Sequence, residues 1–200
     1  MEATLDRLIG HSFTLARIAG WICGLLLTVS AVLIGLDILL RETLVITLGG
    51  ANELSGYALA VSSSWGCTVA LVHRMHVRID SVYTYLSPRI RAVLDIVGLA
   101  AFIYFLMFVT FYAWKVLEQS IESDTHSISA LAAPLAVPQA VWFAGFVVFL
   151  AVACVYLLRA MLAFAKGDLR RVRELLAARS VEEEMEFEKE SLGLTTRSGR

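Results

Sequence analysis

The feature that most constrains this chain is an uninterrupted stretch without formal charge from Leu54 to Val72. At a rise of 1.5 Å per residue, a helix of this length covers about 30 Å, the thickness of the hydrocarbon core of a bilayer. The stretch therefore predicts a membrane-spanning helix. Glu53 precedes it, whereas basic residues follow it at once, namely His73, Arg74, His76 and Arg78. Because positive charge accumulates on the cytoplasmic side of membrane proteins, we expect the basic end to face the cytoplasm.

The composition of the whole chain agrees with membrane insertion. Of the 200 residues, 58% are hydrophobic and the mean hydropathy is +0.72, which is too apolar for a water-soluble domain of this size. The three cysteines lie inside apolar stretches and are odd in number, so they predict no disulfide framework. The net charge of -1 gives no reason to expect nucleic acid as a partner.

Three further apolar stretches complete a predicted membrane domain of residues 18–159. The expected spans cover about residues 18–40, 54–72, 92–115 and 138–158. The loop before the fourth span is acidic, with Glu118, Glu122 and Asp124, whereas basic residues follow that span, namely Lys166, Arg170, Arg171 and Arg173. By the same charge rule, we expect an all-α integral membrane protein with four transmembrane helices and both termini in the cytoplasm.

Two segments flank this membrane domain. Residues 1–17 place apolar side chains on one helical face, so they form either an interfacial helix on the membrane surface or a polar lead-in to the first span. Residues 160–200 are predicted to be a charged cytoplasmic tail, helical from Asp168 to Glu190. Pro88 and Pro138 suit the first turns of the third and fourth helices, and we expect a short interfacial helix before Pro134.

Small side chains recur at helical spacing in the first two spans. In the first span they are Ala16, Gly20, Gly24, Thr28, Ala31 and Gly35. In the second they are Gly56, Ala60, Ser63, Cys67 and Ala70. Because small residues let helix backbones approach closely in lipid, both faces are expected to pack on other helices.

Charged residues near the ends of the spans are the candidate contact residues. Asp37 and Arg41 stand one turn apart and form either a local ion pair or a contact for a partner. In the basic loop, His76 and Asp80 are expected to form a hydrogen bond, while the arginines meet lipid phosphates or a neighbouring subunit. A metal site at His73, His76 and Asp80 is disfavoured because the loop offers no fourth ligand.

The same sequence carries no signature of catalysis or of a cofactor. No histidine lies inside a predicted span, which argues against a bis-histidine haem, and no nucleotide-binding, zinc-protease or serine-hydrolase motif is present. No span carries a charge near its middle, as an ion or proton path requires. We therefore expect a scaffold rather than an enzyme or a self-sufficient transporter, with no cofactor of its own.

The residues around the second span resemble those of a known family. An acid before Leu54, a glycine two-thirds through the span and the sequence His-Val-Arg-Ile-Asp after it are similar to the small membrane subunit (DctQ type) of tripartite ATP-independent periplasmic (TRAP) transporters. The resemblance extends over roughly residues 18–159. The matching positions are Arg41, Glu53, Leu54, Tyr57, Gly66, His76, Arg78 and Asp80. The chain departs from the family at Gly56, where many members carry arginine, and at Ser62–Ser64, where bulky apolar residues are usual.

This resemblance implies a subunit in the bacterial inner membrane. It implies a large membrane subunit as partner, which carries the substrate and sodium, and a periplasmic solute-binding protein that delivers an organic acid. The small subunit is then expected to act as a membrane scaffold and to help dock the binding protein. Partner or lipid contacts are expected at Arg41, Glu53, Gly66, His76, Arg78 and Asp80. Two other classes stay open on the residues alone: a homo-oligomeric tetraspan channel or small exporter, and a membrane assembly factor.

Overall fold

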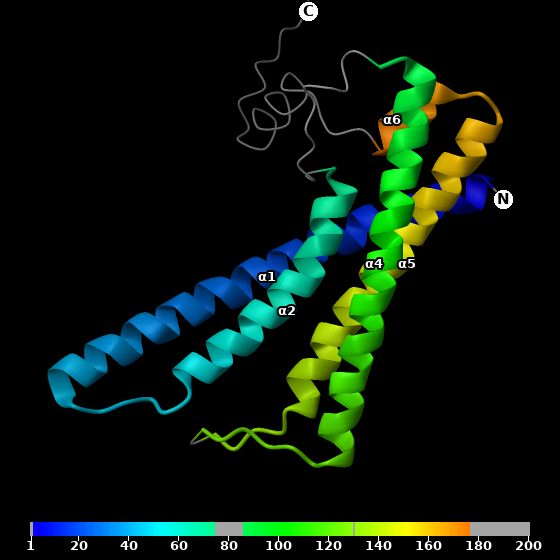
Figure 1. Ribbon diagram of the computed structural model, residues 1–200. Coiled ribbons are helices and arrows are strands. Elements are labelled where there is room, and N and C mark those ends of the chain that lie inside the picture. The colour runs from blue at the N-terminus through cyan, green and yellow to red at the C-terminus, as the bar shows by residue number, and fades with distance from the viewer. Residues whose placement is uncertain (1, 75–85, 130, 177–200) are drawn as a thin grey trace, which may run out of the picture.

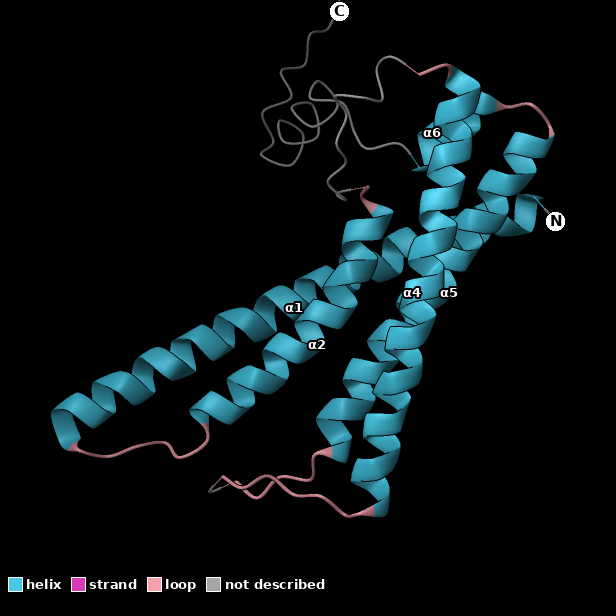
Figure 2. Cartoon of the chain, in the orientation of Figure 1, coloured by secondary structure: helices cyan, strands magenta, loops and turns pink. Residues whose placement is uncertain are grey.

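A computed structural model describes residues 2–74, 86–129 and 131–176, and these residues form helices joined by short loops (Figures 1 and 2). The helices are α1 Glu2–Leu44, α2 Ala51–Val72, α4 Pro88–Glu122, α5 Ala136–Ala165 and α6 Leu169–Leu176. Within the described residues, the only β pairing is an isolated bridge between His126 and Pro134. The all-α prediction is therefore confirmed.

The long helices are arranged as two hairpins. Loop 45–50 joins α1 to α2, and loop 123–135 joins α4 to α5. The hairpins pack on each other chiefly through α2 and α5, and α6 packs against both α5 and α4. Figure 1 shows both loops at one end of the molecule, where the hairpins diverge, and the start of α1 and α6 at the other end. We call these the loop end and the terminal end.

Three of the described helices, α1, α4 and α5, are long and apolar enough to cross a membrane. The 22 residues of α2 cover about 33 Å, which is also sufficient in length. Its hydroxyl-bearing and small residues, such as Ser62, Ser63 and Ser64, make it less apolar than the other three. The four spans and the cytoplasmic placement of both termini remain predictions.

The helices extend beyond the predicted spans. Residues 2–17 continue without a break into the first predicted span, so that α1 has 43 residues. Pro88 occupies the first turn of α4 and Pro138 that of α5, as predicted, because a proline there lacks only an N–H that has no helical partner. In the predicted tail, α6 accounts for the described part of the expected helix, and residues 177–190 of it lie outside the described residues.

The short interfacial helix expected before Pro134 is wrong. Residues 125–129 and 131–135 instead pair with each other, because the Ser127 N–H donates to the Ala133 carbonyl at 2.9 Å and the Leu135 N–H to the Thr125 carbonyl at 3.0 Å. These hydrogen bonds use backbone N–H and C=O groups that in a helix would bond to one another along the chain. The loop is therefore a compact strap rather than a helical turn.

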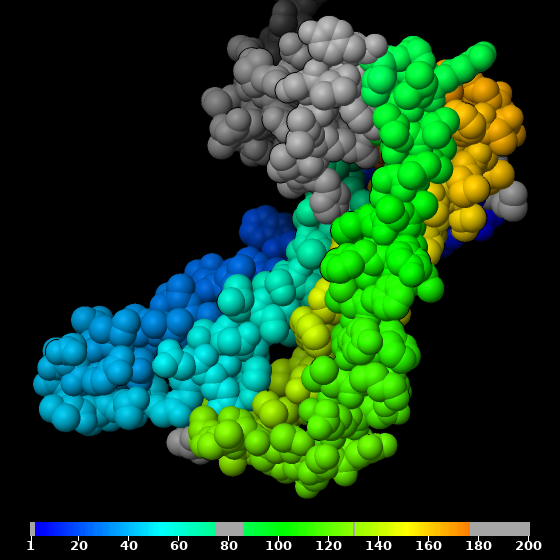
Figure 3. All heavy atoms as spheres, viewed as in Figure 1, coloured from blue at the N-terminus to red at the C-terminus, as the bar shows by residue number. Residues whose placement is uncertain are grey.

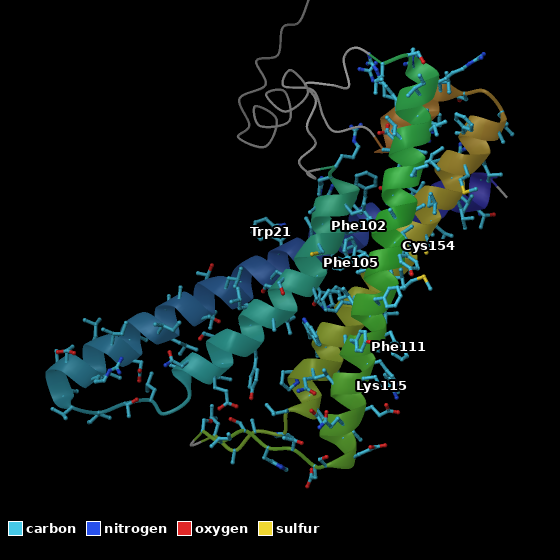
Figure 4. All side chains as sticks on the ribbon, in the orientation of Figure 1. Trp21, Phe102, Phe105, Phe111, Lys115 and Cys154 are labelled. Carbon is cyan, nitrogen blue, oxygen red and sulfur yellow. The ribbon has the colours of Figure 1, made fainter. Side chains whose placement is uncertain are left out.

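The interior lies between α2, α4 and α5, toward the terminal end. It contains Val72, Leu99, Ile103, Leu106, Phe149, Val152 and Tyr156, and Phe102 contacts Phe149 edge-on with ring centroids 5.6 Å apart. By contrast, large apolar side chains on the outer sides of α1 and α4 are exposed. Trp21 is 79% exposed and projects from α1 away from α2 (Figure 4). Such wide apolar surfaces suit lipid or a protein partner rather than water.

The small-residue faces of α1 and α2 are only partly buried within the chain. On α1, Ala16 is fully buried, whereas Gly24, Thr28, Ala31 and Gly35 are exposed. On α2, the buried small residues are Ala51, Ala58, Ser62, Ser64 and Thr68, whereas Gly56 and Ser63 are exposed. The two hairpins thus use only part of the small residues for their own packing.

Candidate functional site

The acidic residue at the start of α2 joins the two hairpins at the loop end. Both oxygens of the Glu53 carboxylate accept hydroxyl hydrogen bonds, one from Tyr57 on α2 and the other from Ser129 in the 123–135 loop. The Ser127 hydroxyl in turn donates to the Ser129 hydroxyl at 3.2 Å. Because a carboxylate is a strong acceptor, this network fastens the loop to α2. Glu53 is therefore a structural anchor, with its side chain half-buried.

A glycine beside Glu53 brings the same loop closer. A Cβ atom on Gly50 would lie 2.1 Å from Cδ1 of Leu131, so the Leu131 side chain occupies the space that any other residue at position 50 would need. Figure 3 shows the 123–135 loop reaching from the α4–α5 hairpin toward the start of α2. We call this contact, formed by Gly50, Glu53, Tyr57, Ser127, Ser129 and Leu131, the strap contact.

Arg41 lies at the same end and is largely exposed. The nearby Asp37 carboxylate accepts hydrogen bonds from the Leu48 N–H at 2.7 Å and the Thr47 hydroxyl at 3.0 Å, and so shapes loop 45–50. Arg41 stands 4.0 Å from that carboxylate, and its side chain is 59% exposed. A pair at this separation and exposure contributes little to stability, so the Arg41 guanidinium is accessible to a partner or to lipid.

Two helices of the hairpins come into close contact where Ser64 and Trp65 of α2 meet Gly145 of α5. A Cβ atom on Gly145 would lie 2.4 Å from Oγ of Ser64 and 2.8 Å from Cδ1 of Trp65. The Trp65 indole N–H donates to the Val141 carbonyl at 3.0 Å. Ser64 is fully buried. Only glycine at position 145 permits this approach, so the contact sets the rotation of α2 against α5.

Gly66 does not take part in this packing. A Cβ atom built on Gly66 would meet no atom within 4 Å, and the same holds for Gly56 nearer the start of α2. No contact within the described chain therefore explains a glycine at position 66. The position is open to another helix that approaches α2 from outside.

At the terminal end, one carboxylate connects three helices. Oδ1 of Asp6 on α1 accepts a hydrogen bond from Nε of Arg159 on α5 at 2.9 Å, and Oδ2 accepts one from an Nη atom of the same guanidinium at 3.4 Å. Arg171 on α6 donates to Oδ1 at 3.4 Å. Arg159 is only 8% exposed. We call Asp6, Arg159 and Arg171 the terminal network.

Glu174 extends the terminal network along α6. It accepts hydrogen bonds from Arg171 at 3.2 Å and from Arg170 at 3.0 Å. The Arg171 guanidinium, followed by that of Arg170, holds the pKa of the Glu174 carboxyl below its ordinary value. Glu174 therefore stays ionised and balances part of the positive charge of α6.

Three of the six residues predicted as contact sites are described, and they lie apart from one another. Arg41 and Glu53 lie at the loop end, and Gly66 lies farther along α2. His76, Arg78 and Asp80 lie outside the described residues. Among residues 2–74, 86–129 and 131–176, no group of three His, Cys, Asp or Glu side chains is arranged to hold a metal ion.

Most residues that join the two hairpins were not predicted from the sequence, and neither were those of the terminal network. Asp6, Ser129, Gly145 and Arg159 lie far apart in the chain, and no periodic pattern connects them. One signal was available: Arg159 is the first charge after the long apolar stretch of the fourth span, where a buried guanidinium needs a carboxylate partner.

Comparison with known proteins gives one family. The model of the DctQ component of tripartite ATP-independent periplasmic transporters matches residues 30–163. This region begins in α1, includes all of α2 and α4, and ends near the end of α5. No curated protein and no solved structure matches the chain.

Proposed function

Because the chain belongs to the DctQ component family of tripartite ATP-independent periplasmic transporters, we propose that it is a membrane scaffold for the large transport subunit of such a system. The observation that carries the proposal is the placement of charge. Each of the four long helices contains a stretch of 19 or more uncharged residues, and the charged residues lie toward the ends. Such helices provide packing surfaces in a membrane but offer no charged path for an ion.

We propose a topology of four spans in the bacterial inner membrane with both termini in the cytoplasm. Two contacts support it. The terminal network joins the start of α1 to the end of α5, and the strap contact joins the 123–135 loop to the start of α2 at the opposite end (Figure 1). The terminal end is rich in arginine, as expected of a cytoplasmic face.

The transport steps belong to the partners in this proposal. The large subunit imports an organic acid coupled to sodium, and a periplasmic binding protein delivers the acid. The loop end, with the exposed Arg41 and the strap contact, helps to dock that binding protein. The described chain offers the large subunit its uncovered helix faces, including the open position at Gly66.

Co-purification with a large transport subunit from the same organism tests the proposal. We expect the full-length chain to retain that subunit in detergent, and deletion of the chain to abolish uptake of the organic acid. Gly66→Leu is expected to weaken co-purification because it fills the open position on α2. Gly98→Leu fills an equally open position on α4, so a loss confined to Gly66→Leu would assign the large subunit to the face of α2. Uptake that persists undiminished after deletion of the chain would overturn the scaffold role.

A further inference from the structure

The short helix α6 is held against the bundle by its apolar side. Gly167 has φ +78°, a backbone conformation that favours glycine, and it reverses the chain after α5. The Asp168 carboxylate then accepts the Arg171 N–H at 3.0 Å and caps the start of α6. Val172, Leu175 and Leu176 are buried. Because α6 packs against both α5 and α4, these contacts hold its apolar side toward the bundle.

The opposite side of α6 carries positive charge to the surface. The side chain of Arg170 is 90% exposed, and Arg173, one turn further on, is exposed as well. Residues 166–176 contain four basic and two acidic side chains. Both acids are engaged, Asp168 as the cap and Glu174 with Arg170 and Arg171. An excess of positive charge therefore remains on the outer side of α6.

This side of α6 lies at the depth of lipid headgroups if the chain spans the membrane. Arg159 is the first charge after the uncharged stretch 136–158, so α5 leaves the hydrocarbon layer close to it. From Arg159 to Ala165, the end of α5, the helix rises about 9 Å, which is roughly the depth of one headgroup layer. Because α6 turns back and packs on α5 and α4, it returns from this end into the headgroup layer.

We propose that the outer side of α6, with Arg170 and Arg173, binds the headgroups of anionic phospholipids of the inner leaflet. The guanidinium groups donate hydrogen bonds to the lipid phosphate, and the fixed apolar side of α6 keeps them at the required depth. The surface selects anionic over zwitterionic lipids because residues 166–176 carry more basic than acidic side chains, so a net positive charge remains after the pairing of Glu174. This inference of lipid binding goes beyond the scaffold role, and it requires only that the chain be inserted in a membrane.

Lipid selectivity of the full-length protein tests this inference. The protein is reconstituted in nanodiscs of phosphatidylcholine with a minor fraction of phosphatidylglycerol, and spin-labelled forms of each lipid report their association with it. We expect phosphatidylglycerol to be preferred at low ionic strength. Arg170→Gln with Arg173→Gln is expected to lower that preference by up to about fivefold for each arginine removed. Added salt is expected to reduce the preference of the wild type toward that of the variant.

The matched control removes the same charge elsewhere. Arg197→Gln with Arg200→Gln changes the net charge equally but leaves α6 intact, and its preference should equal that of the wild type. Correct folding of each variant is checked by helical circular dichroism and gel filtration. The inference is overturned if the α6 variant keeps the wild-type preference, or if the control loses as much. It is also overturned if the α6 variant keeps the preference but no longer co-purifies with the large subunit, because α6 would then contact a protein.

Discussion

Ser64 and Gly145 stand so close that a methyl group on Gly145 would clash with the serine side chain: a Cβ atom on Gly145 would lie 2.4 Å from the Ser64 Oγ. The approach brings α2 and α5 into contact and allows the Trp65 indole to reach the Val141 carbonyl at 3.0 Å. In lipid, where burial of apolar surface gives little drive for helix association, this kind of close packing holds helices together.

Replacement of Gly145 by alanine is expected to destabilise the pairing of the hairpins. The added methyl group must displace Ser64 or the Trp65 ring, at a cost of about 1–3 kcal/mol as for other overpacked interiors. Unfolding by sodium dodecyl sulfate in mixed micelles, followed by circular dichroism, measures the loss. Gly98→Ala is the control, since it adds the same group where nothing lies within 4 Å. Equal stability of the two variants would contradict the close contact.

Replacement of Asp6 by asparagine is expected to destabilise the terminal network. Arg159 is 8% exposed and would lose its carboxylate, at a cost of about 1–2 kcal/mol. The same unfolding assay measures it. Exchange of the charges in Asp6→Arg with Arg159→Asp should recover part of the loss, whereas Arg7→Gln, at an exposed neighbour, should have little effect. Direct pairing would be contradicted if the exchange variant lost as much free energy of unfolding as the two single variants together, or more.

Glu53 and Ser129 are expected to be energetically coupled. The loss of either partner breaks the same carboxylate–hydroxyl bond, so a double-mutant cycle of Glu53→Ala and Ser129→Ala should give a coupling energy of about 1–2 kcal/mol. Limited proteolysis of the 123–135 loop supplies a second readout, with faster cleavage expected in each single variant. Additive effects of the two substitutions would show that the strap contact does not depend on this bond.

Replacement of Val45 by glycine is expected to stabilise the protein. Val45 follows the last residue of α1 with φ 56° and is 90% exposed. A β-branched residue is strained in this conformation, and glycine relieves the strain at the end of a helix, so we expect a gain of about 1 kcal/mol. Thermal unfolding in detergent measures the gain. Val45→Ala should give a smaller gain in stability, because alanine also carries a Cβ. Equal gains would contradict the strain, and would instead assign the effect to removal of the exposed apolar side chain.

The all-α class could be predicted because each uncharged stretch has the length that a helix needs to cross the hydrocarbon core of a bilayer. The two prolines at positions 88 and 138 then located the first turns of α4 and α5, since proline lacks the N–H that a helix start does not use. These signals are local in the sequence. They depend on the solvent and on the backbone, and not on which helices meet.

The contacts between helices could not be predicted in the same way. The rotation of α2 follows from the single approach of Ser64 to Gly145, and it exposes Gly56 and Ser63, which share the predicted small-residue face. Asp6 and Arg159 are 153 residues apart, and no local sequence pattern around either residue identifies the other as its partner. The strap shape of residues 125–135 depends on backbone pairs that no residue type specifies.

The length of α1 has a mechanical consequence. Its 43 residues cover about 65 Å, roughly twice the hydrocarbon thickness, without interruption between the Asp6 carboxylate and loop 45–50. An unbroken helix behaves as a stiff rod over this distance. In the topology proposed above, a tilt imposed at the loop end would therefore be transmitted to the arginines of the terminal network without any rearrangement of α1 between them.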